Sequence, residues 1–399
     1  MANTLLDISM IAKESLLSLK NELGMAKSCS SQYDDRFAKS GAKIGDTISI
    51  RKANRYAVNS GQTLSLGDVE EESVSLTLDS QRHVDFQFSS KDMALTIDEF
   101  SNRYIKPAII PLANSLDVAL AGLYTEVPAA VGTPGTTMTD LTDALAAHQK
   151  MKEAGCPVTT NNLVIDPAAE ASVVNGLSGK FQSAEQISRQ YEKGMMGLAG
   201  GFAWKMDQNV AKHTVGAYAG TPLVDGASQV GSTLNTDGWT SGASALAKGD
   251  VFTIANVFAV NPQSKISTGQ LQQFVVTAAI SDTSGDKAIS IYPAITVSGA
   301  KQNVSGSPAD NAAITVKGTA STAYPQHLAF HKDAFVFGCA DLVMPSGVDM
   351  ASRASDADSG LALRIVRDYD INNDRLITRI DVLFGVLAQF PELGCRIYN

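Results

Sequence analysis

TIDEFSNRYIKPAIIPLANSLDVALAGLYTEV, residues 96–127, is the stretch of this chain that decides the predicted fold. Its apolar residues recur in steps of three or four and so share one stripe of a helix: Ile97, Phe100, Tyr104, Ala108, Leu112, Leu116, Ala119 and Leu123. Thr96 with Glu99 is typical of a capping box. Pro107 and Pro111 each remove a helical hydrogen bond, so we expect a bend there. Such a helix spans about 45 Å, and an extended structure must pack along it.

Composition restricts the class of protein. The 399 residues are 44% hydrophobic and 18% charged, which favours two or three folded units, each with its own core. The net charge of -9 argues against a surface built to neutralise phosphates. We find no apolar run of about 18 residues, and therefore predict no signal peptide and no membrane span. Cys29, Cys156, Cys339 and Cys395 lie far apart in the sequence, which favours reduced thiols in a cytoplasm.

The N-terminal hundred residues contain a helix and a hairpin by their periodicity. Residues 4–23 place Ile8, Leu16 and Leu23 on one helical face, which either docks on its own domain or reaches a partner chain. From Ile44 to Phe88 apolar and polar residues alternate, which predicts hairpin strands that project from the molecule. The acidic run Glu70, Glu71 and Glu72 is either a solvated tip or a contact to basic residues of another chain.

An α/β unit is predicted after a Gly/Pro/Thr linker at residues 128–137. Leu141, Ala144, Leu145, His148 and Lys152 trace an amphipathic helix in this unit. A short strand follows at Leu163–Ile165, and the next helix starts at Pro167 with Asp166 as its cap. Residues 183–193 are expected to be helical. The glycine-rich stretch 194–201 lacks the spacing of a phosphate-binding loop and is interpreted as a mobile loop.

A β-rich region begins near Leu223, where helical periodicity vanishes for about 100 residues. Short strands are predicted at Val251–Val260, Phe274–Ile280, Ile289–Val297 and Ile314–Val316. Mixed structure on both sides of this region favours an inserted, barrel-like, all-β domain.

The C-terminal region is predicted to form a strand at Ala334–Phe337, a polar loop at Ser346–Ser359 and a long hairpin. The hairpin strands hold Leu363 to Ile371 and Leu376 to Phe384, with a turn at residues 372–374. Arginines alternate with aspartates along both strands. We expect these cross-strand ion pairs to contribute about 0.2 to 1 kcal/mol each.

No pattern in the chain predicts catalysis or metal binding. His327 and His331 are four residues apart, but Leu328 stands where a zinc protease needs glutamate. Asp368, Asp370 and Asn372 resemble the opening of a calcium loop, but Asn373 replaces its glycine and Arg379 its final glutamate. No GxSxG motif is present. We therefore expect no catalytic, cofactor-binding or metal-binding residues, no cofactor and no enzyme activity.

Four phrases carry a resemblance to a known family: GFAWKMDQNVAKHTVGAY (201–218), KGDVFTIANVFAVNPQSKISTGQLQQFVVT (248–277), HLAFHKDAFVFGCADLVMP (327–345) and LRIVRDYDINNDRLITRIDVLFG (363–385). With the order of parts, they resemble the major capsid (coat) proteins of tailed bacteriophages. The phrases narrow this resemblance to the family of short-tailed Salmonella-phage-like coat proteins that carry an inserted β domain. This shell fold is shared with the herpesvirus capsid floor.

The resemblance implies an α+β, tailed-phage major capsid fold with seven segments. These are an N-terminal arm (1–43), an extended β-hairpin loop (44–95), a spine helix in a peripheral domain (96–134), an axial α/β domain (135–222), an inserted β-barrel domain (223–323), a return to the axial domain (324–352) and a long peripheral/axial β-hairpin (353–399).

The function implied by the resemblance is self-assembly into an icosahedral shell of hexamers and pentamers that encloses double-stranded DNA without sequence-specific binding. Scaffolding, portal and possible decoration proteins are the implied partners, with assembly of a maturing procapsid in the bacterial cytoplasm and a final location in the virion. Three alternatives stay open: an encapsulin-like cargo shell, a β-rich secreted adhesin or binding module, and a hydrolase whose catalytic triad forms only in the folded structure.

Overall fold

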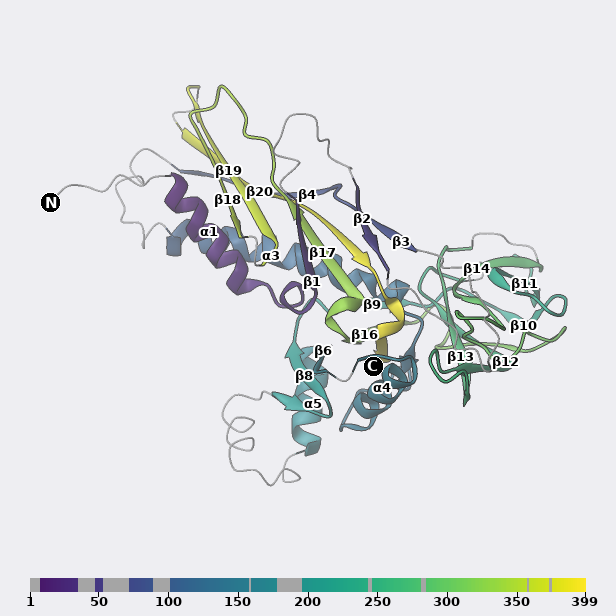
Figure 1. Ribbon diagram of the computed structural model, residues 1–399. Coiled ribbons are helices and arrows are strands. Elements are labelled where there is room, and N and C mark those ends of the chain that lie inside the picture. The colour runs from purple at the N-terminus through teal and green to yellow at the C-terminus, as the bar shows by residue number, and fades with distance from the viewer. Residues whose placement is uncertain are drawn as a thin grey trace, which may run out of the picture. The chain divides into compact units, whose positions relative to one another are not determined.

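The computed structural model describes residues 8–34, 47–52, 72–88, 101–157, 159–177, 196–242, 246–280, 285–356, 359–372 and 375–399. The chain has a mixed α+β fold and divides into two units. The first unit comprises Met1–Arg51, Ser73–Leu120 and Phe335–Gln389, and the second comprises Lys52–Glu72, Ala121–Ala334 and Phe390–Asn399. Each unit therefore joins segments that lie far apart in the sequence (Figure 1).

The first unit is built on a six-stranded sheet with the order β1-β17-β20-β19-β18, in which β4 also pairs with β20. The strands are β1 (Ser30–Asp34), β4 (Ser80–Phe88), β17 (Phe335–Ala340), β18 (Met350–Asp356), β19 (Leu361–Asp370) and β20 (Arg375–Ala388). The predicted C-terminal hairpin is confirmed as β19 and β20. Strand β18 lies where a loop was predicted, because its small and polar residues carry no apolar alternation although its backbone pairs with β19.

The predicted N-terminal hairpin is confirmed only in part. Strands β2 (Thr47–Arg51) and β3 (Ser73–Thr77) pair antiparallel, with Ile48 opposite Leu76. The prediction that the next strand continues this hairpin is wrong, because β4 pairs with β20 along nine residues. The hairpin also contributes to a core, since Leu76 and Leu78 are fully buried and cluster with Val336 and Leu383. Glu70 and Glu71 lie outside the described residues.

The long helix is confirmed from residue 101 onward. A π-helical turn (Ser101–Ile105) leads into α3 (Lys106–Ala121) and a 3-10 turn, η5 (Gly122–Glu126). The buried stripe is Ile105, Ala108, Ile109, Leu112, Ala113, Leu116, Leu120 and Tyr124. It passes through Leu120 and Tyr124 instead of the predicted Ala119 and Leu123, because 3.6 residues per turn moves it by one position. The capping box at Thr96 lies outside the described residues.

The continuous helix Arg103–Glu126 also meets the length and composition of a membrane span, with a mean hydropathy of 1.3. Buried core helices of folded proteins meet the same criteria. Asp117 lies in the middle of this helix and is 4% exposed. Its carboxylate accepts backbone N–H groups from Gly24 (2.8 Å), Met25 (3.1 Å) and Ala26 (3.0 Å). These contacts place the helix in a protein core.

The N-terminal helix α1 (Ile8–Glu22) docks on its own chain, as the first of the two interpretations of this segment predicted. It packs against β18 and β19 (Figure 1). Ala12 and Leu19 are fully buried in this contact, whereas Leu17 on the opposite face is 54% exposed. The hydrogen bonds that Asp117 accepts fix the position of the backbone between the end of α1 and the short 3-10 turn η1 (Ala26–Ser28).

The second unit contains a seven-stranded sheet with the order β5-β21-β16-β6-β8-β7, in which β9 also pairs with β16. Its strands are β5 (Ala130–Val131), β6 (Asn161–Ile165), β7 (Leu198–Ala199), β8 (Phe202–Met206), β9 (Lys212–Thr214), β16 (Ala323–Phe330) and β21 (Gly394–Tyr398). Helices α4 (Thr142–Glu153) and α5 (Pro167–Leu177) contribute to its core. The predicted cap is confirmed, because Asp166 Oδ1 accepts the Ala169 N–H at 2.7 Å.

Three predictions about this sheet are wrong. The linker at residues 128–137 contains β5, which pairs in parallel with β21 and is buried. The glycine-rich stretch contains β7, which forms a hairpin with β8. Helix α4 buries Ala144, Ala147 and Met151, while Leu145 is 51% exposed. Small residues form much of the packing of β5, β7 and α4, and a search for hydrophobic periodicity detects such residues poorly. Residues 183–193 lie outside the described residues.

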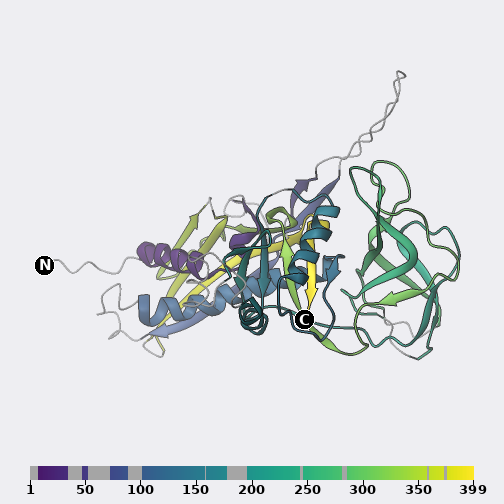
Figure 2. The same cartoon turned by 90° about the horizontal axis from the view of Figure 1, so that it is seen from below.

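The second unit also contains a six-stranded antiparallel sheet with the order β10-β11-β14-β13-β12-β15 (Figures 1 and 2). Its strands are β10 (Gly220–Val224), β11 (Gly231–Trp239), β12 (Val251–Val260), β13 (Ser267–Val276), β14 (Lys287–Ile295) and β15 (Ile314–Val316). A bridge between Leu223 and Ala313 joins the two ends of the sheet, which we call the barrel. The strands at 251–260 and 314–316 are confirmed, whereas β10 and β11 were not predicted.

Replacement of Asp117 tests its role in the first unit. Asp117→Ala should lower the free energy of unfolding by about 2 to 4 kcal/mol, because three N–H groups lose a charged acceptor. Asp117→Asn keeps an acceptor oxygen and should cost less. Urea unfolding measures both. Val118→Ala, at a neighbouring exposed position, is the control and should stay within about 0.5 kcal/mol; an equal loss in the control would contradict the assignment.

Candidate functional site

A buried polar network connects the barrel to the seven-stranded sheet within the second unit. We call Tyr124, His213, Asp250 and Arg396 the junction network. His213 Nε2 lies 2.7 Å from Asp250 Oδ1, and His213 Nδ1 lies 3.1 Å from the Tyr124 hydroxyl. Asp250 is 0% exposed and His213 2%. Asp250 also accepts the backbone N–H groups of Gly216 and Ala247. A charged group from the barrel is thus held by donors from several segments.

Arg396 lies in the centre of β21 and is 0% exposed. Its Nη1 donates to the Gly249 carbonyl at 2.8 Å, and its guanidinium carbon lies 5.7 Å from the Tyr124 ring centre. Burial lowers the pKa of Arg396. Arginine stays protonated in proteins, so the network contains a positive charge as well as the Asp250 carboxylate.

Gln273 of β13 forms a second connection to the seven-stranded sheet. Its Oε1 accepts the Ala130 N–H at 2.8 Å, and its Nε2 donates to the Ala130 carbonyl at 2.8 Å. One side chain therefore replaces a missing strand neighbour for β5. Lys150 Nζ of α4 donates to the same Oε1 at 2.9 Å, and burial lowers the pKa of this lysine.

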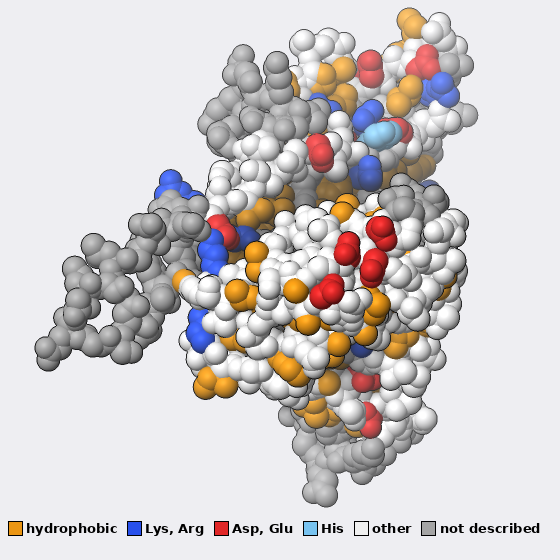
Figure 3. Space-filling view, turned by 90° about the vertical axis from the view of Figure 1, so that its right-hand side faces the viewer, with side chains coloured by type: hydrophobic (Ala, Val, Ile, Leu, Met, Phe, Trp, Pro, Cys, Tyr) orange, Lys and Arg blue, Asp and Glu red, His pale blue; other side chains and the backbone are white. Residues whose placement is uncertain are grey.

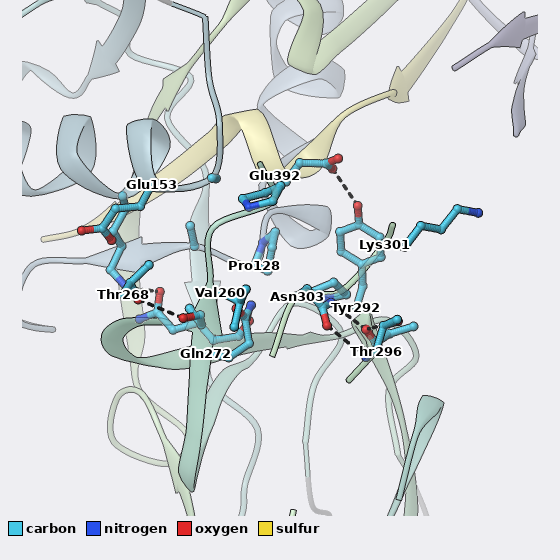
Figure 4. Close-up of a pocket in the computed structure, with 18 of the residues that line it drawn as sticks. Pro128, Glu153, Val260, Thr268, Gln272, Tyr292, Thr296, Lys301, Asn303 and Glu392 are labelled. Atoms are coloured by element: carbon cyan, nitrogen blue, oxygen red, sulfur yellow. Dashed lines mark hydrogen bonds between the residues drawn. The ribbon is translucent and has the colours of Figure 1, made fainter. Parts of the chain in front are cut away.

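A groove of about 610 Å³ lies beside this connection, lined by barrel residues, α4 and the segment before β21 (Figure 4). In the described residues, β13 and β14 pair only at Val275 with Tyr292 and Val276 with Ile291. The groove is lined by the parts of β13 and β14 next to these paired residues. Tyr292 donates its hydroxyl proton to Glu392 at 2.8 Å, and Lys301 pairs with Glu72 at 2.5 Å on the rim. Glu72 thus contacts a lysine of its own chain.

The two histidines singled out from the sequence occupy separate hydrogen-bonded positions. His327 is fully buried in β16 and accepts the Asp166 N–H at 3.3 Å. Burial lowers the pKa of His327 to about 4, with Asp166 acting in the opposite direction. His331 Nε2 lies 2.9 Å from the Thr159 hydroxyl. Among the described residues no group of three or more His, Cys, Asp or Glu side chains is placed to hold a metal ion.

The aspartates of the C-terminal hairpin take part in ion pairs and turns. Asp370 pairs with Arg375 at 2.9 Å and accepts the Asn372 N–H at 3.1 Å, so its carboxylate is engaged by a cation of its own hairpin. Asp381 is 0% exposed and receives Arg364 at 2.6 Å. Asp381 also accepts the Gln81 side-chain amide at 2.8 Å, so this pair is buried between residues of β19 and β4.

Two buried cysteines and the exposed acidic residues of the barrel are the remaining polar groups of interest. Burial raises the pKa of the Cys339 and Cys395 thiols to about 12, which makes them poor nucleophiles. Exposed acidic residues of the barrel include Asp225, Asp286 and Asp310. On the face shown in Figure 3, acidic side chains gather without basic ones between them.

The functional residues that sequence reasoning missed are the junction network and Gln273, because no local motif marks contacts between such distant segments.

Comparison with known proteins identifies the class to which this chain belongs. A profile of a viral coat-protein family matches residues 1–398 and so defines a shell-forming capsid protein. The family is "P22 coat protein - gene protein 5", and the chain belongs to it. It is a major capsid protein that forms an icosahedral shell, and its place is in the capsid of the virion. Membership of a structural family implies a non-enzymatic role.

Solved structures show weaker similarity. The capsid of Ralstonia phage GP4 is 9% identical, over 94% of this chain and 88% of that chain, with a TM-score of 0.47. The asymmetric unit of the bacteriophage PhiM1 mature capsid is 10% identical, over 94% and 86%, with a TM-score of 0.43. The CUS-3 coat protein I-domain is 30% identical, over 25% of this chain and 96% of that chain, with a TM-score of 0.19. A comparison with curated proteins finds no match.

Loss of the Gln273 amide should weaken the connection at Ala130. Gln273→Leu keeps a similar volume but removes the acceptor of the Ala130 N–H and the closer of the two donors to the Ala130 carbonyl, the other being Lys317 Nζ at 3.4 Å. We expect amide hydrogen exchange at Ala130 to become about ten times faster or more. Gln270→Leu is the control, because this side chain of the same strand forms no hydrogen bond in the described part of the chain. Equal protection of Ala130 in both variants would contradict the role of Gln273.

The pKa of His327 predicts a pH dependence of stability. Its folded pKa of about 4 lies below the unfolded value of about 6.5, so the unfolded chain binds more protons between these pH values. Stability should therefore fall as pH drops from 6.5 to 4, by about 3 kcal/mol at most from this group. In His327→Gln, the midpoint of urea unfolding should depend less on pH between pH 6.5 and pH 4 than it does in the wild-type protein. The exposed His83→Gln variant should not, and a wild-type slope in His327→Gln would refute the assignment.

Proposed function

We propose that this capsid protein assembles through a scaffold-assisted procapsid into hexamers and pentamers, with a portal protein at one site and the option of decoration proteins. The shell matures around double-stranded DNA, which it encloses without sequence-specific contacts. The single observation that supports this most is the match to a coat-protein family along residues 1–398. The net charge of -9 is consistent with it, because an acidic shell does not adhere to the DNA inside.

We also propose assembly in the host bacterial cytoplasm, no catalytic residues and the seven segments outlined above. Two buried thiols with raised pKa values and two histidines held by separate partners support a structural role for the candidate side chains. The encapsulin-like and adhesin alternatives receive no support from the family match, which names a coat protein.

The barrel, whose strands β10 to β15 span residues 220–316 and overlap the expected 223–323 domain, is proposed to be an inserted module that folds on its own. Its buried core includes Val224, Leu234, Phe252, Phe274, Ile289 and Ile314, and these residues pack mainly against one another. Its first and last strands lie side by side through the bridge from Leu223 to Ala313, so the chain enters and leaves at one place. Insertion at such a pair of neighbouring ends leaves the host fold continuous.

Excision tests the module. The isolated segment 218–318 should show cooperative thermal unfolding with the circular dichroism of a β protein, because its ladder and core are complete. The remaining chain, with residues 220–316 replaced by a short Gly/Ser linker, should fold but be less stable, because His213 loses Asp250 and Arg396 loses the Gly249 carbonyl. A molten isolated segment would overturn the proposed boundary.

Assembly is tested with the purified chain, expressed alone and then with the neighbouring scaffold-like gene. Negative-stain microscopy and sedimentation should show closed shells, tubes or spirals in at least one condition, and regular shells more often with the scaffold. Persistent monomers in both conditions would contradict the proposed assembly route.

A further inference from the structure

One edge of a buried arginine has no protein partner. Arg396 uses Nη1 for the Gly249 carbonyl, whereas its Nε and Nη2 atoms are buried and have no hydrogen-bond partner in the described part of the chain. Nε and Nη2 form one side of the guanidinium, and their N–H groups point the same way. This is the side with which arginine binds carboxylates and other anions in a bidentate manner.

The charge around this edge is not balanced by a direct ion pair. No carboxylate among the described residues forms one with Arg396. The Asp250 carboxylate of the junction network is engaged by His213 and by the backbone N–H groups of Gly216 and Ala247. A buried guanidinium without an anionic partner is costly, because the low dielectric of the interior penalises an isolated charge.

A second cation, Lys317, lies near the same tyrosine ring as Arg396 and donates to the Ala130 carbonyl at 3.4 Å. Lys317 Nζ lies 5.3 Å from the centre of the Tyr398 ring, and the guanidinium carbon of Arg396 lies 6.0 Å from the same centre. Burial lowers the pKa of Lys317 to about 8; the neighbouring Lys150 and Arg396 charges act in the same direction, and Cys395 and Asp143 act in the opposite one. Lys317 and Arg396 thus place two cationic groups around the Tyr398 ring.

A neutral donor completes the set. The Tyr398 hydroxyl is buried and has no partner among the described residues. Tyr398 lies two residues after Arg396 on β21, so the two side chains leave the strand on the same face. Buried polar groups in native proteins are almost always satisfied by protein, water or an ion.

We propose that the Nε–Nη2 edge of Arg396, together with the Tyr398 hydroxyl from the same face of β21, binds a small inorganic anion of the chloride class. The anion neutralises the guanidinium and so stabilises the contact that Arg396 makes with Gly249 at the base of the barrel. This site is independent of the proposed scaffold, portal and DNA contacts, since all its donors belong to one unit of one chain.

The full-length subunit tests the site by thermal unfolding at constant ionic strength, with sodium chloride replaced stepwise for sodium gluconate. The melting midpoint should rise with chloride and saturate, with a total shift of about 2 to 4 °C. Arg396→Met should lose this dependence. Arg353→Met, which removes a half-exposed arginine, should keep it. A midpoint that ignores chloride, or that rises without saturation in both variants, would overturn the proposal.

Because Arg396→Met could fail to fold, a second measurement uses the wild-type subunit and Tyr398→Phe. Binding of chloride to a protein broadens the ³⁵Cl magnetic resonance line of the bulk ion. Excess broadening should appear with the wild-type subunit, decrease when bromide is added as a competitor, and be reduced in Tyr398→Phe. Absence of excess broadening with the folded wild-type protein would show that water alone occupies the guanidinium edge and would refute the anion site.

Discussion

The constraint on which each unit depends is the cost of burying a carboxylate. Asp117 in the first unit and Asp250 in the second are 4% and 0% exposed. Asp117 accepts N–H groups from distant residues, and Asp250 contacts the distant His213 and Gly216 as well as the nearby Ala247. Removing an ionised group from water is unfavourable unless several donors replace the water. Each carboxylate therefore fixes the position of the segments whose N–H groups it accepts.

These buried groups explain how a chain with dispersed segments forms two well-defined units. Hydrophobic burial is not directional and would accept many arrangements of similar volume. Hydrogen bonds to Asp117 require the end of α1 to meet the middle of α3, and those to Asp250 require the base of the barrel to meet the residues around His213. For a shell subunit this has a functional consequence, because repeated assembly requires every copy to present the same surface.

Much of the fold could be predicted from periodicity. The helix through Leu112, the strands at 251–260 and 361–370, and the cap at Asp166 have strong local patterns, and the structure contains all of them. Strands β5 and β18 could not be predicted, because small or polar residues form them and their stability comes from backbone pairing with distant partners. The junction network was missed for the same reason, since Tyr124, Asp250 and Arg396 come from three distant parts of the sequence.

The sequence by itself determined the class of this protein. Its phrases and the order of its parts indicate a coat protein, and its helical and strand periods determine most elements, because these depend on contacts within a few residues. Only the tertiary structure decided that α1 docks on its own chain, that β4 joins the large sheet and that Gln273 replaces a strand neighbour for Ala130. The physical reason is that burial and hydrogen-bond satisfaction are properties of a position in space, which segments from opposite ends of the chain create together.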